Sequence, residues 1–373
     1  MAGSRRMTEF CKSLHRPRPA RVRHLGRVLY GEGLRMQGAL AECVQGGGPD
    51  QLLLLEHNPV YTLGRNATRA DIHVLDAFLA ENGIEVHRID RGGQVTYHGP
   101  GQIVAYPICN LRGQSVSKLV NGLEQAMIET AKGFGVRAER LEGHPGVWVE
   151  TARGWEKLGA IGLHLKKWVS THGLAFNLAP KMEHYQWITA CGIADKGVCS
   201  LRTLLGDACP SWTEASASLE RHLLEALELE PLPAVEPSRS VSITVWRRGA
   251  KGPEILMAPR HPHDNDQWQS GVTDIVEPGE TFEAAAKGIM DETGLHGRFA
   301  SLDFSHTHCH GPAPTVGHEP FFNTEACFHL EVMPDATVRL NKAERSRWCP
   351  PEEAMLLMAH EGGREAIRLL VLN

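Results

Sequence analysis

The sequence predicts a two-domain protein of mixed α and β structure (class α/β, α+β), and three observations support this. A chain of 373 residues is longer than one ordinary core requires, and it fits two domains of about 100–250 residues each. Apolar residues recur with a strand period in some segments and with a helix period in others. The composition also changes near residue 230, where proline and acidic residues gather.

The first half begins with a predicted strand and a predicted helix. Residues 51–55 form an apolar run that ends at Glu56-His57-Asn58-Pro59, as expected for a buried strand followed by a turn. Ser117 can cap a following helix. Five apolar residues fall on one face of that helix: Leu119, Leu123, Ala126, Met127 and Phe134.

Two strands and a second helix follow. Residues 146–150 and 160–165 are predicted strands, and residues 213–228 are a predicted helix. The apolar face of this helix carries four leucines: Leu219, Leu223, Leu224 and Leu227.

The domain boundary is predicted at a proline-rich, acidic segment. Residues 230–239 are typical of a linker, because proline stiffens the chain and supplies no ladder donor. Residues 240–246 then alternate with a strand period. We therefore expect a tail (1–21), a first domain (22–229), this linker and a second domain (240–373).

Charge and composition exclude several classes of protein. The net charge of -5 argues against a nucleic-acid binder, and no apolar run approaches the roughly 20 residues that cross a membrane. The 9 cysteines form no Cys-x-x-Cys pair, so we expect a reducing, cytoplasmic setting. The Arg-rich start could be an organellar transit segment, but Pro17 and Pro19 interrupt it, which favours a frayed cytosolic terminus.

Three segments of the first domain could carry chemistry. Residues 91–102 (Arg-Gly-Gly-Gln-Val-Thr-Tyr-His-Gly-Pro-Gly-Gln) contain four glycines, which allow close backbone approach to a phosphate or an acyl chain, or form two tight turns. Lys157 precedes a run of small residues, where it is either a solvated lysine or an ammonium at a site. Cys191 precedes Gly192, which could leave the thiol open beside a backbone N–H, although a single cysteine is more often buried and inert.

Together these segments resemble the lipoyl(octanoyl) transferase family in order and spacing. The resemblance runs from about Val22 to Leu227 and includes residues 56–64, 145–149 and 170–177. It implies the α/β fold of biotin and lipoate protein ligases. It also implies that Cys191 forms an acyl-thioester. Lys157 would lower the pKa of the Cys191 thiol and act as general acid/base. The implied acyl pocket consists of Arg91, Gly92, Gly93, Gln94, Val95, Thr96, Tyr97, His98, Ala160, Ile161, Gly162, Gly173, Leu174 and Ala175.

The implied reaction moves an octanoyl group from acyl carrier protein to a lysine of an apo-lipoyl domain. The acceptors would be lipoyl domains of 2-oxoacid dehydrogenase complexes or the glycine cleavage H protein, with no nucleic acid and no membrane involved. Exchange between two thioesters is nearly isoenergetic, so a cysteine is a suitable relay, and a nearby ammonium favours its thiolate. The donor is already activated, so no ATP or cofactor is expected. Backbone N–H groups near Gly162 or Gly192 could hold the oxyanion, and His98 and His172 are either substrate-positioning or structural.

The second domain resembles a Nudix hydrolase, an α/β/α sandwich, with an altered signature box. Residues 268–281 match its front half and residues 284–295 its back half. The Arg-Glu pair of the box is Lys287-Gly288, its leading glycine is replaced by Asp274, and one residue is missing. Glu280, Asp291 and Glu292 remain as possible Mg²⁺ ligands if this domain is active. We expect an inactive or regulatory domain.

The Nudix signature box does not account for one local pattern in the second domain. His306, His308 and His310 alternate, so a strand would place three imidazoles on one face, where they form either a zinc site or a polar sheet face. Two alternatives to octanoyl transfer remain for the whole chain: an ATP-dependent lipoate or biotin ligase, and a bifunctional enzyme with Nudix nucleotide hydrolase activity.

Overall fold

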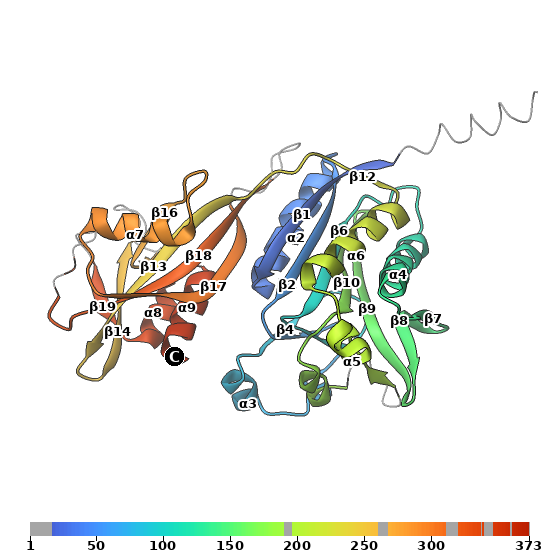
Figure 1. Ribbon diagram of the computed structural model, residues 1–373, viewed down its shortest axis with the longest axis horizontal. Coiled ribbons are helices and arrows are strands. Elements are labelled where there is room, and N and C mark those ends of the chain that lie inside the picture. The colour runs from blue at the N-terminus through green and yellow to red at the C-terminus, as the bar shows by residue number, and fades with distance from the viewer. Residues whose placement is uncertain are drawn as a thin grey trace, which may run out of the picture. The chain divides into compact units, whose positions relative to one another are not determined.

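The computed structural model describes residues 17–189, 196–259, 268–310, 320–336, 338, 346–358 and 360–372. Within these residues the chain forms two compact units that divide between Val235 and Glu236 (Figure 1). No helix of the described ranges is long and apolar enough to cross a membrane. The predicted mixed α and β class is confirmed in both units.

The first unit is built on a nine-stranded sheet and a small three-stranded sheet. The large sheet has the order β12-β1-β2-β6-β10-β9-β8-β7, with β11 beside β9, and the small one has the order β4-β3-β5. The strands are β1 (Arg18–Val28), β2 (Asp50–His57), β3 (Val60–Leu63), β4 (Glu85–Arg88), β5 (Val95–His98), β6 (Gln102–Ile108), β7 (Glu139–Leu141), β8 (His144–Thr151), β9 (Gly154–Lys166), β10 (Val169–Asn177), β11 (Gly197–Val198) and β12 (Leu229–Pro231). The helices are α2 (Tyr30–Gln45), α3 (Asp76–Glu81), α4 (Val116–Gly133), α5 (Leu201–Leu205) and α6 (Trp212–Ala226), with short 3₁₀ turns η1 (Arg69–Asp71), η2 (Met182–Trp187) and η4 (Gly206–Ala208).

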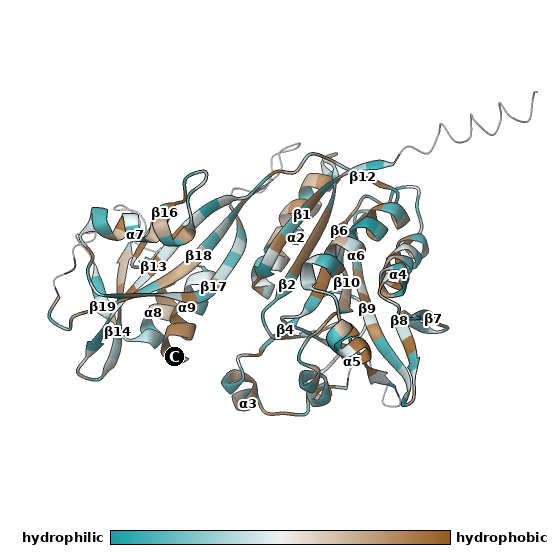
Figure 2. Cartoon of the chain, in the orientation of Figure 1, coloured by the Kyte–Doolittle hydropathy of each residue, from teal (hydrophilic) through white to brown (hydrophobic). Residues whose placement is uncertain are grey.

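Helices α4 and α6 bury their apolar faces against the large sheet. Leu119, Leu123 and Met127 of α4 join Leu219 and Leu223 of α6 in one core with side chains of the central strands. Figure 2 shows apolar and polar residues on different faces of α4. The predicted strand at 51–55 is confirmed within β2, and those at 146–150 and 160–165 are confirmed within β8 and β9.

Helix ends differ from prediction where caps compete. Ser115, not Ser117, caps α4, because its side chain accepts a hydrogen bond from the backbone N–H of Lys118. Helix α6 begins after Ser211, which forms a capping box with Glu214. The helix ends at Ala226, before the predicted limit, since Glu228 takes a left-handed conformation with φ of 56°.

The predicted tail and linker are shorter than expected. Strand β1 begins at Arg18, inside the predicted tail, because it pairs with β2 and with β12. Strand β12 takes the start of the predicted linker and β13 takes its end, so the extended connection runs from 232 to 237. The proline-rich, acidic segment thus lies between β12 and β13, and backbone pairing sets the limits of the connection.

The second unit is one mixed sheet with helices. Its order is β15-β14-β13-β18-β17, with β16 beside β13 and β19 beside β14. The strands are β13 (Ser238–Gly249), β14 (Gly252–Pro259), β15 (Trp268–Ser270), β16 (Val272–Ile275), β17 (Arg298–His310), β18 (Phe321–Val332) and β19 (Arg347–Cys349), and the helices are α7 (Phe282–Thr293), α8 (Pro351–Leu357) and α9 (Glu361–Leu372). The predicted strand at 240–246 is confirmed within β13, whose Val241, Ile243 and Val245 are fully buried.

Candidate active site

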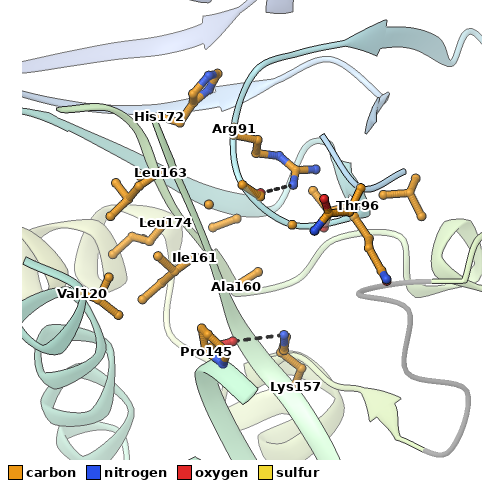
Figure 3. Close-up of a pocket in the computed structure, with 18 of the residues that line it drawn as sticks. Arg91, Thr96, Val120, Pro145, Lys157, Ala160, Ile161, Leu163, His172 and Leu174 are labelled. Carbon is orange, nitrogen blue, oxygen red and sulfur yellow. Dashed lines mark hydrogen bonds between the residues drawn. The ribbon is translucent and has the colours of Figure 1, made fainter. Parts of the chain in front are cut away.

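A pocket of about 480 Å³ lies in the first unit, where the predicted segments meet. Its volume is within the usual range for small-molecule sites. The glycine loop and the middle parts of β9 and β10 form its walls (Figure 3). The predicted residues that line it are Arg91, Gly92, Gly93, Gln94, Val95, Thr96, His98, Lys157, Ala160, Ile161, Gly162, Gly173, Leu174 and Ala175.

One wall of the pocket is apolar. Ile161 and Leu163 are two residues apart in β9 and so share a face, and Leu174 comes from the neighbouring strand β10. Val116 and Val120, one helical turn apart, add the side of α4. Figure 3 shows the labelled aliphatic side chains gathered on one side of the space. This wall is suited to a hydrocarbon chain.

Arg91 holds the glycine loop against β9. Its guanidinium donates hydrogen bonds to both the carbonyl and the hydroxyl of Thr62 (2.8 Å each) and to the carbonyl of Gly92 (3.0 Å). The backbone N–H of Gly92 donates to the carbonyl of Leu163 (3.0 Å). A Cβ at Gly162 would stand 2.7 Å from Cδ of Arg91, so this approach requires glycine. The loop is therefore a rigid lining rather than a pair of free turns.

Lys157 is a buried ammonium in the pocket wall. The residue is 8% exposed, and its Nζ donates a hydrogen bond to the carbonyl of Pro145 (3.2 Å). The same Nζ lies 4.6 Å from the centre of the Trp148 ring, whose face attracts a cation. Figure 3 shows the bond to Pro145 across the pair β8 and β9. These contacts hold the charged group beside the apolar wall.

Strand β8, which carries Pro145, is anchored to α4 by Glu124. This carboxylate is 6% exposed and accepts a hydrogen bond from the backbone N–H of Gly146 (3.0 Å). Its other oxygen lies 2.9 Å from Nε of Arg140. The buried backbone donor beside Pro145 is thereby satisfied, which keeps the acceptor of Lys157 in place.

Two neutral imidazoles lie beside the polar end of the pocket. Burial lowers the pKa of His98 to about 3 and that of His57 to about 4. Nδ1 of His98 donates to the side-chain oxygen of Gln102 (2.7 Å), while His57 donates to the carbonyl of Val28 and accepts from the hydroxyl of Tyr106 (2.7 Å each). These hydrogen bonds fix one tautomer of each ring. Both rings are uncharged at neutral pH.

His172 also lines the pocket, in a conformation with φ of 59°. Burial lowers its pKa, against the opposing effect of Asp90, whose carboxylate lies 3.1 Å from Nε2. This contact ties β10 to the residue before Arg91.

One predicted site residue does not line the pocket, and another lies outside the described residues. Tyr97 does not line it: its ring packs edge-on against Tyr61, His184 and Tyr185, because successive residues of β5 point to opposite faces. Its assignment to the acyl pocket is therefore wrong. Cys191 and its neighbour Gly192 lie outside the described residues.

Several pocket residues were not predicted. Val116 and Val120 lie off the apolar stripe that packs α4 on the sheet, and apolar residues outside a core stripe could have signalled a second contact. Leu163 lies on the same face of β9 as Ile161. Tyr30, Asn66 and Tyr106 reach the pocket from distant segments, and no local sequence pattern indicates them.

The Nudix-box remnants do not assemble a metal site in the described part of the chain. Glu280 accepts a hydrogen bond from the backbone N–H of Glu277 (3.1 Å), and Asp291 and Glu292 are exposed on α7. The one group of three metal-ligating side chains within the described ranges lies elsewhere. Gly288, where the box has its glutamate, is exposed on the same helix.

Comparison with known proteins agrees with both halves of this description. Residues 30–223 match the lipoyl protein ligase A/B catalytic domain, and residues 237–370 match the NUDIX domain. An octanoyltransferase of Myxococcus xanthus is 37% identical over 356 residues, 93% of this chain and 98% of that protein. One of Chloroflexus aggregans is 43% identical over 218 residues, 57% of this chain and 97% of that protein.

A solved structure shares the fold of the first unit. It is a bipartite lipoate protein ligase of Thermoplasma acidophilum, analysed with its E2 lipoyl domain, with a TM-score of 0.50 and 16% identity. The match covers 59% of this chain and 88% of that one.

The fold, the pocket and these matches define the class of enzyme: the chain belongs to the lipoyl protein ligase A/B catalytic domain family, with a C-terminal NUDIX domain. Within that family its near full-length relative is an octanoyltransferase. The chain is accordingly an acyltransferase that performs octanoyl transfer in protein lipoylation.

Proposed function

We propose that the chain takes octanoyl from acyl carrier protein and passes it to a lysine of an apo-lipoyl domain through a thioester on Cys191. The observation that carries this proposal is the position of Lys157, a buried ammonium fixed in the wall of an apolar pocket. The apolar wall is suited to the octanoyl chain, and the ammonium to the reacting carbonyl and thiol at its end.

The described neighbours of Cys191 support its reach to Lys157. On one side the backbone N–H of Thr189 donates to the carbonyl of Asp71 (2.9 Å). On the other side Val198 pairs with Lys157 itself, and the N–H of Cys199 donates to the Lys157 carbonyl (3.0 Å). Cys191 precedes Val198 by seven residues, and such a length spans at most about 25 Å. The described chain is therefore anchored at Lys157 seven residues after Cys191 in the sequence, a length that permits the thiol to reach the lysine.

The proposed reaction has two steps. The Cys191 thiolate attacks the thioester carbonyl of the donor, and the phosphopantetheine thiol leaves with the proton of Lys157. The acceptor amine then attacks the acyl-cysteine and gives its proton to the neutral Lys157, while Cys191 departs as thiolate. An amide has formed, and both enzyme groups have returned to their starting states.

This scheme requires no ATP, metal or cofactor, because the donor thioester supplies the driving force. The acceptors we propose are the lipoyl domains of 2-oxoacid dehydrogenase complexes or the glycine cleavage H protein. A free thiolate nucleophile also fits a reducing compartment, and we place the reaction in the cytoplasm.

The test is intact mass spectrometry after incubation with octanoyl-acyl carrier protein in the absence of ATP. We expect wild type to gain one octanoyl group, which an apo-lipoyl domain removes, and Cys191→Ser to gain none. Lys157→Ala should acylate about 10²–10⁴-fold more slowly, the usual contribution of a general acid/base. Lys166→Ala is the matched control, because this lysine is exposed at the far end of the same strand.

The alternative ligase reaction gives a different result. If no adduct forms and transfer occurs only with ATP and free octanoate, the thioester mechanism is wrong and the pocket binds an acyl-adenylate.

A further inference from the structure

The second unit has a polar face on its sheet. Strand β18 places Asn323, Glu325 and Cys327 on one face, and β17 places His306 and His308 beside them. The neighbouring strand β13 contributes serines and a threonine to the same face: Ser238, Ser240, Ser242 and Thr244. A row of hydrophilic side chains on a strand face under a helix is unusual, because burial of polar groups is costly.

Three of these side chains bring metal-binding atoms together. The ligand atoms of His306, Glu325 and Cys327 all lie within 4.8 Å of one another. Nε2 of His306 is 3.4 Å from a carboxylate oxygen of Glu325. Bond lengths of about 2.0–2.3 Å around a tetrahedral zinc ion place neighbouring ligand atoms roughly 3.3–3.7 Å apart. The three side chains therefore need only small adjustments to share one ion.

The imidazole of His306 is buried and lacks well-formed hydrogen bonds. The residue is 3% exposed, Nδ1 has no hydrogen bond, and the 3.4 Å contact of Nε2 with the Glu325 carboxylate is not aligned as one. The ring stacks on Phe304 with centroids 5.4 Å apart, and Gly362 at the start of α9 leaves no room for a Cβ against it. Buried polar atoms are nearly always satisfied, so an unsatisfied imidazole nitrogen facing a carboxylate and a thiol points to an absent ligand.

We propose that His306, Glu325 and Cys327 bind a divalent transition-metal ion of the zinc class. The set supplies one nitrogen, one oxygen and one sulfur donor, the combination that borderline-soft Zn²⁺ takes and that Mg²⁺ avoids. This site is distinct from the Nudix-box remnants Glu280, Asp291 and Glu292, which do not come together in the described part of the chain. It is also independent of octanoyl transfer in the first unit.

Three protein ligands leave one position of the ion for an exchangeable molecule. His306 and Glu325 both line a pocket of the second unit, together with Ser240, Ser242 and Asn323. Asn323 donates a hydrogen bond to Ser240 (2.7 Å), and Ser242 donates to the sulfur of Cys327 (3.4 Å). Hydrogen bonds from side chains around a metal site orient the residues that bind the ion. The open position therefore faces a pocket that a small anion or a carbonyl compound could enter.

The experiment uses the full-length protein, stripped with a chelator and titrated with Zn²⁺ and with Co²⁺. We expect about one ion per chain, with the charge-transfer absorption of a cobalt–thiolate bond and the visible bands of a four-coordinate site. Azide should shift the visible bands by taking the open position. Cys327→Ser should lose the charge-transfer absorption, and His306→Ala should weaken Zn²⁺ binding more than about 100-fold.

Matched controls separate the site from incidental metal binding. Cys309→Ser removes a thiol from the same pair of strands, and His329→Ala removes an imidazole that Trp246 already contacts (3.2 Å). Both should bind cobalt as wild type does. Circular dichroism of each stripped variant checks that the domain is folded. The proposal is overturned if the folded wild type binds less than about 0.1 ion, or if Cys327→Ser keeps the cobalt–thiolate absorption.

Discussion

Arg91 and the glycines around it form the rigid part of the pocket in the first unit. The guanidinium is buried and donates hydrogen bonds to Thr62 and to the carbonyl of Gly92. These bonds hold it against β9. The aliphatic part of the Arg91 side chain packs against Gly162, where any larger residue would collide with it. The shape of the pocket therefore depends on one close approach.

Gly162→Ala tests that approach. The added Cβ would lie 2.7 Å from Cδ of Arg91, and overpacking of this kind costs about 1–3 kcal/mol. We expect a lower free energy of unfolding in urea and slower octanoylation of the enzyme. Gly38→Ala, at an exposed helical position with open space around its Cβ, should leave octanoylation unchanged and raise the free energy of unfolding by about 0.5–1 kcal/mol, because alanine favours a helix over glycine. Equal behaviour of the two variants would show that Arg91 can move.

The neutral histidines predict a loss of stability in acid. The pKa of His57 is lowered to about 4 and that of His98 to about 3, whereas an unfolded histidine has a pKa near 6.5. The unfolded chain thus binds more protons below pH 6.5. The stabilisation is complete above that pH and is lost as the pH falls towards the folded values. Each histidine should cost about 2 kcal/mol between pH 7 and pH 5.

Urea unfolding at both pH values measures this loss. In His57→Gln the side chain still offers one donor and one acceptor but cannot gain a proton. The variant should therefore lose about 2 kcal/mol less than wild type on acidification. An identical loss in both proteins would mean that His57 titrates normally in the folded state.

Single residues were predicted where a motif defines them. The glycine loop and Lys157 follow from the resemblance, and all but one of the described residues proposed for the pocket line it. The exception, Tyr97, belongs to the motif but points away from the pocket, because a motif contains both faces of a strand. Tyr30 and Tyr106 were missed because long-range packing brings them to the site.

At the scale of elements, the contact between α4 and β8 positions Lys157. Glu124 lies on α4, binds the N–H of Gly146 and is paired with Arg140. The adjacent Pro145 carbonyl accepts the hydrogen bond of Lys157. A helix that packs through its apolar face thus also sets the position of a buried charge.

Glu124→Ala tests this positioning role. A buried backbone N–H would lose its acceptor, at a cost of about 1–3 kcal/mol in the free energy of unfolding. We expect slower acylation of the enzyme as well, and partial recovery in Glu124→Gln, which retains a side-chain oxygen. Glu129→Ala, on the same helix with a largely solvent-facing pair to Lys132, should have little effect. Normal acylation in a destabilised Glu124→Ala would limit the role of Glu124 to folding.

Elements were predicted well in type and less well at their ends. Apolar periodicity located β2, α4 and α6, because a buried face must repeat with the period of the backbone. Their limits depended on competition between neighbouring caps, such as Ser115 and Ser117, which the pattern cannot rank. The ends of β1 and β12 depended on each other, since neither strand has a partner until the chain has folded.

At the scale of the whole molecule, the relatives show which unit carries the transferase fold. The octanoyltransferase of Chloroflexus aggregans matches over 218 residues, close to the length of the first unit and nearly all of that protein. The relative from Myxococcus xanthus matches over 356 residues, which requires both units. The first unit therefore carries the transferase fold, and the NUDIX domain is an addition shared with some relatives.

Cleavage of the connection should leave transfer intact. Residues 232–237 belong to no helix or strand, and Val235 is 54% exposed, so a protease site placed around it should be cut in the folded protein. We expect the cut protein to octanoylate a lipoyl domain at a rate within about twofold of the intact chain, since few contacts usually cross such a linker. The intact protein with the same inserted site is the control. A large loss on cutting would mean that the second unit supports the reaction.

The two-unit division was predictable because proline and acidic residues gather where no core can form. Only part of the metal-ligand set of the second unit could be predicted from the sequence. The alternation of His306 and His308 indicated a shared face, but Glu325 and Cys327 come from the facing strand, and register is not readable from one strand alone. The side chain of His310, the third histidine of that pattern, lies outside the described residues.

The pairing of β1 with β12 makes the first unit a nearly closed loop of chain. Arg18 lies opposite Leu229 and Ala20 opposite Pro231, so the two ends of the unit are neighbours in one sheet. Ends that meet in this way permit circular permutation. A short bridge could join them while new ends open at an exposed turn such as Arg112–Gly113, far along the chain from Lys157. The same geometry would let the unit be inserted as a cassette into a loop of another protein, with its pocket undisturbed.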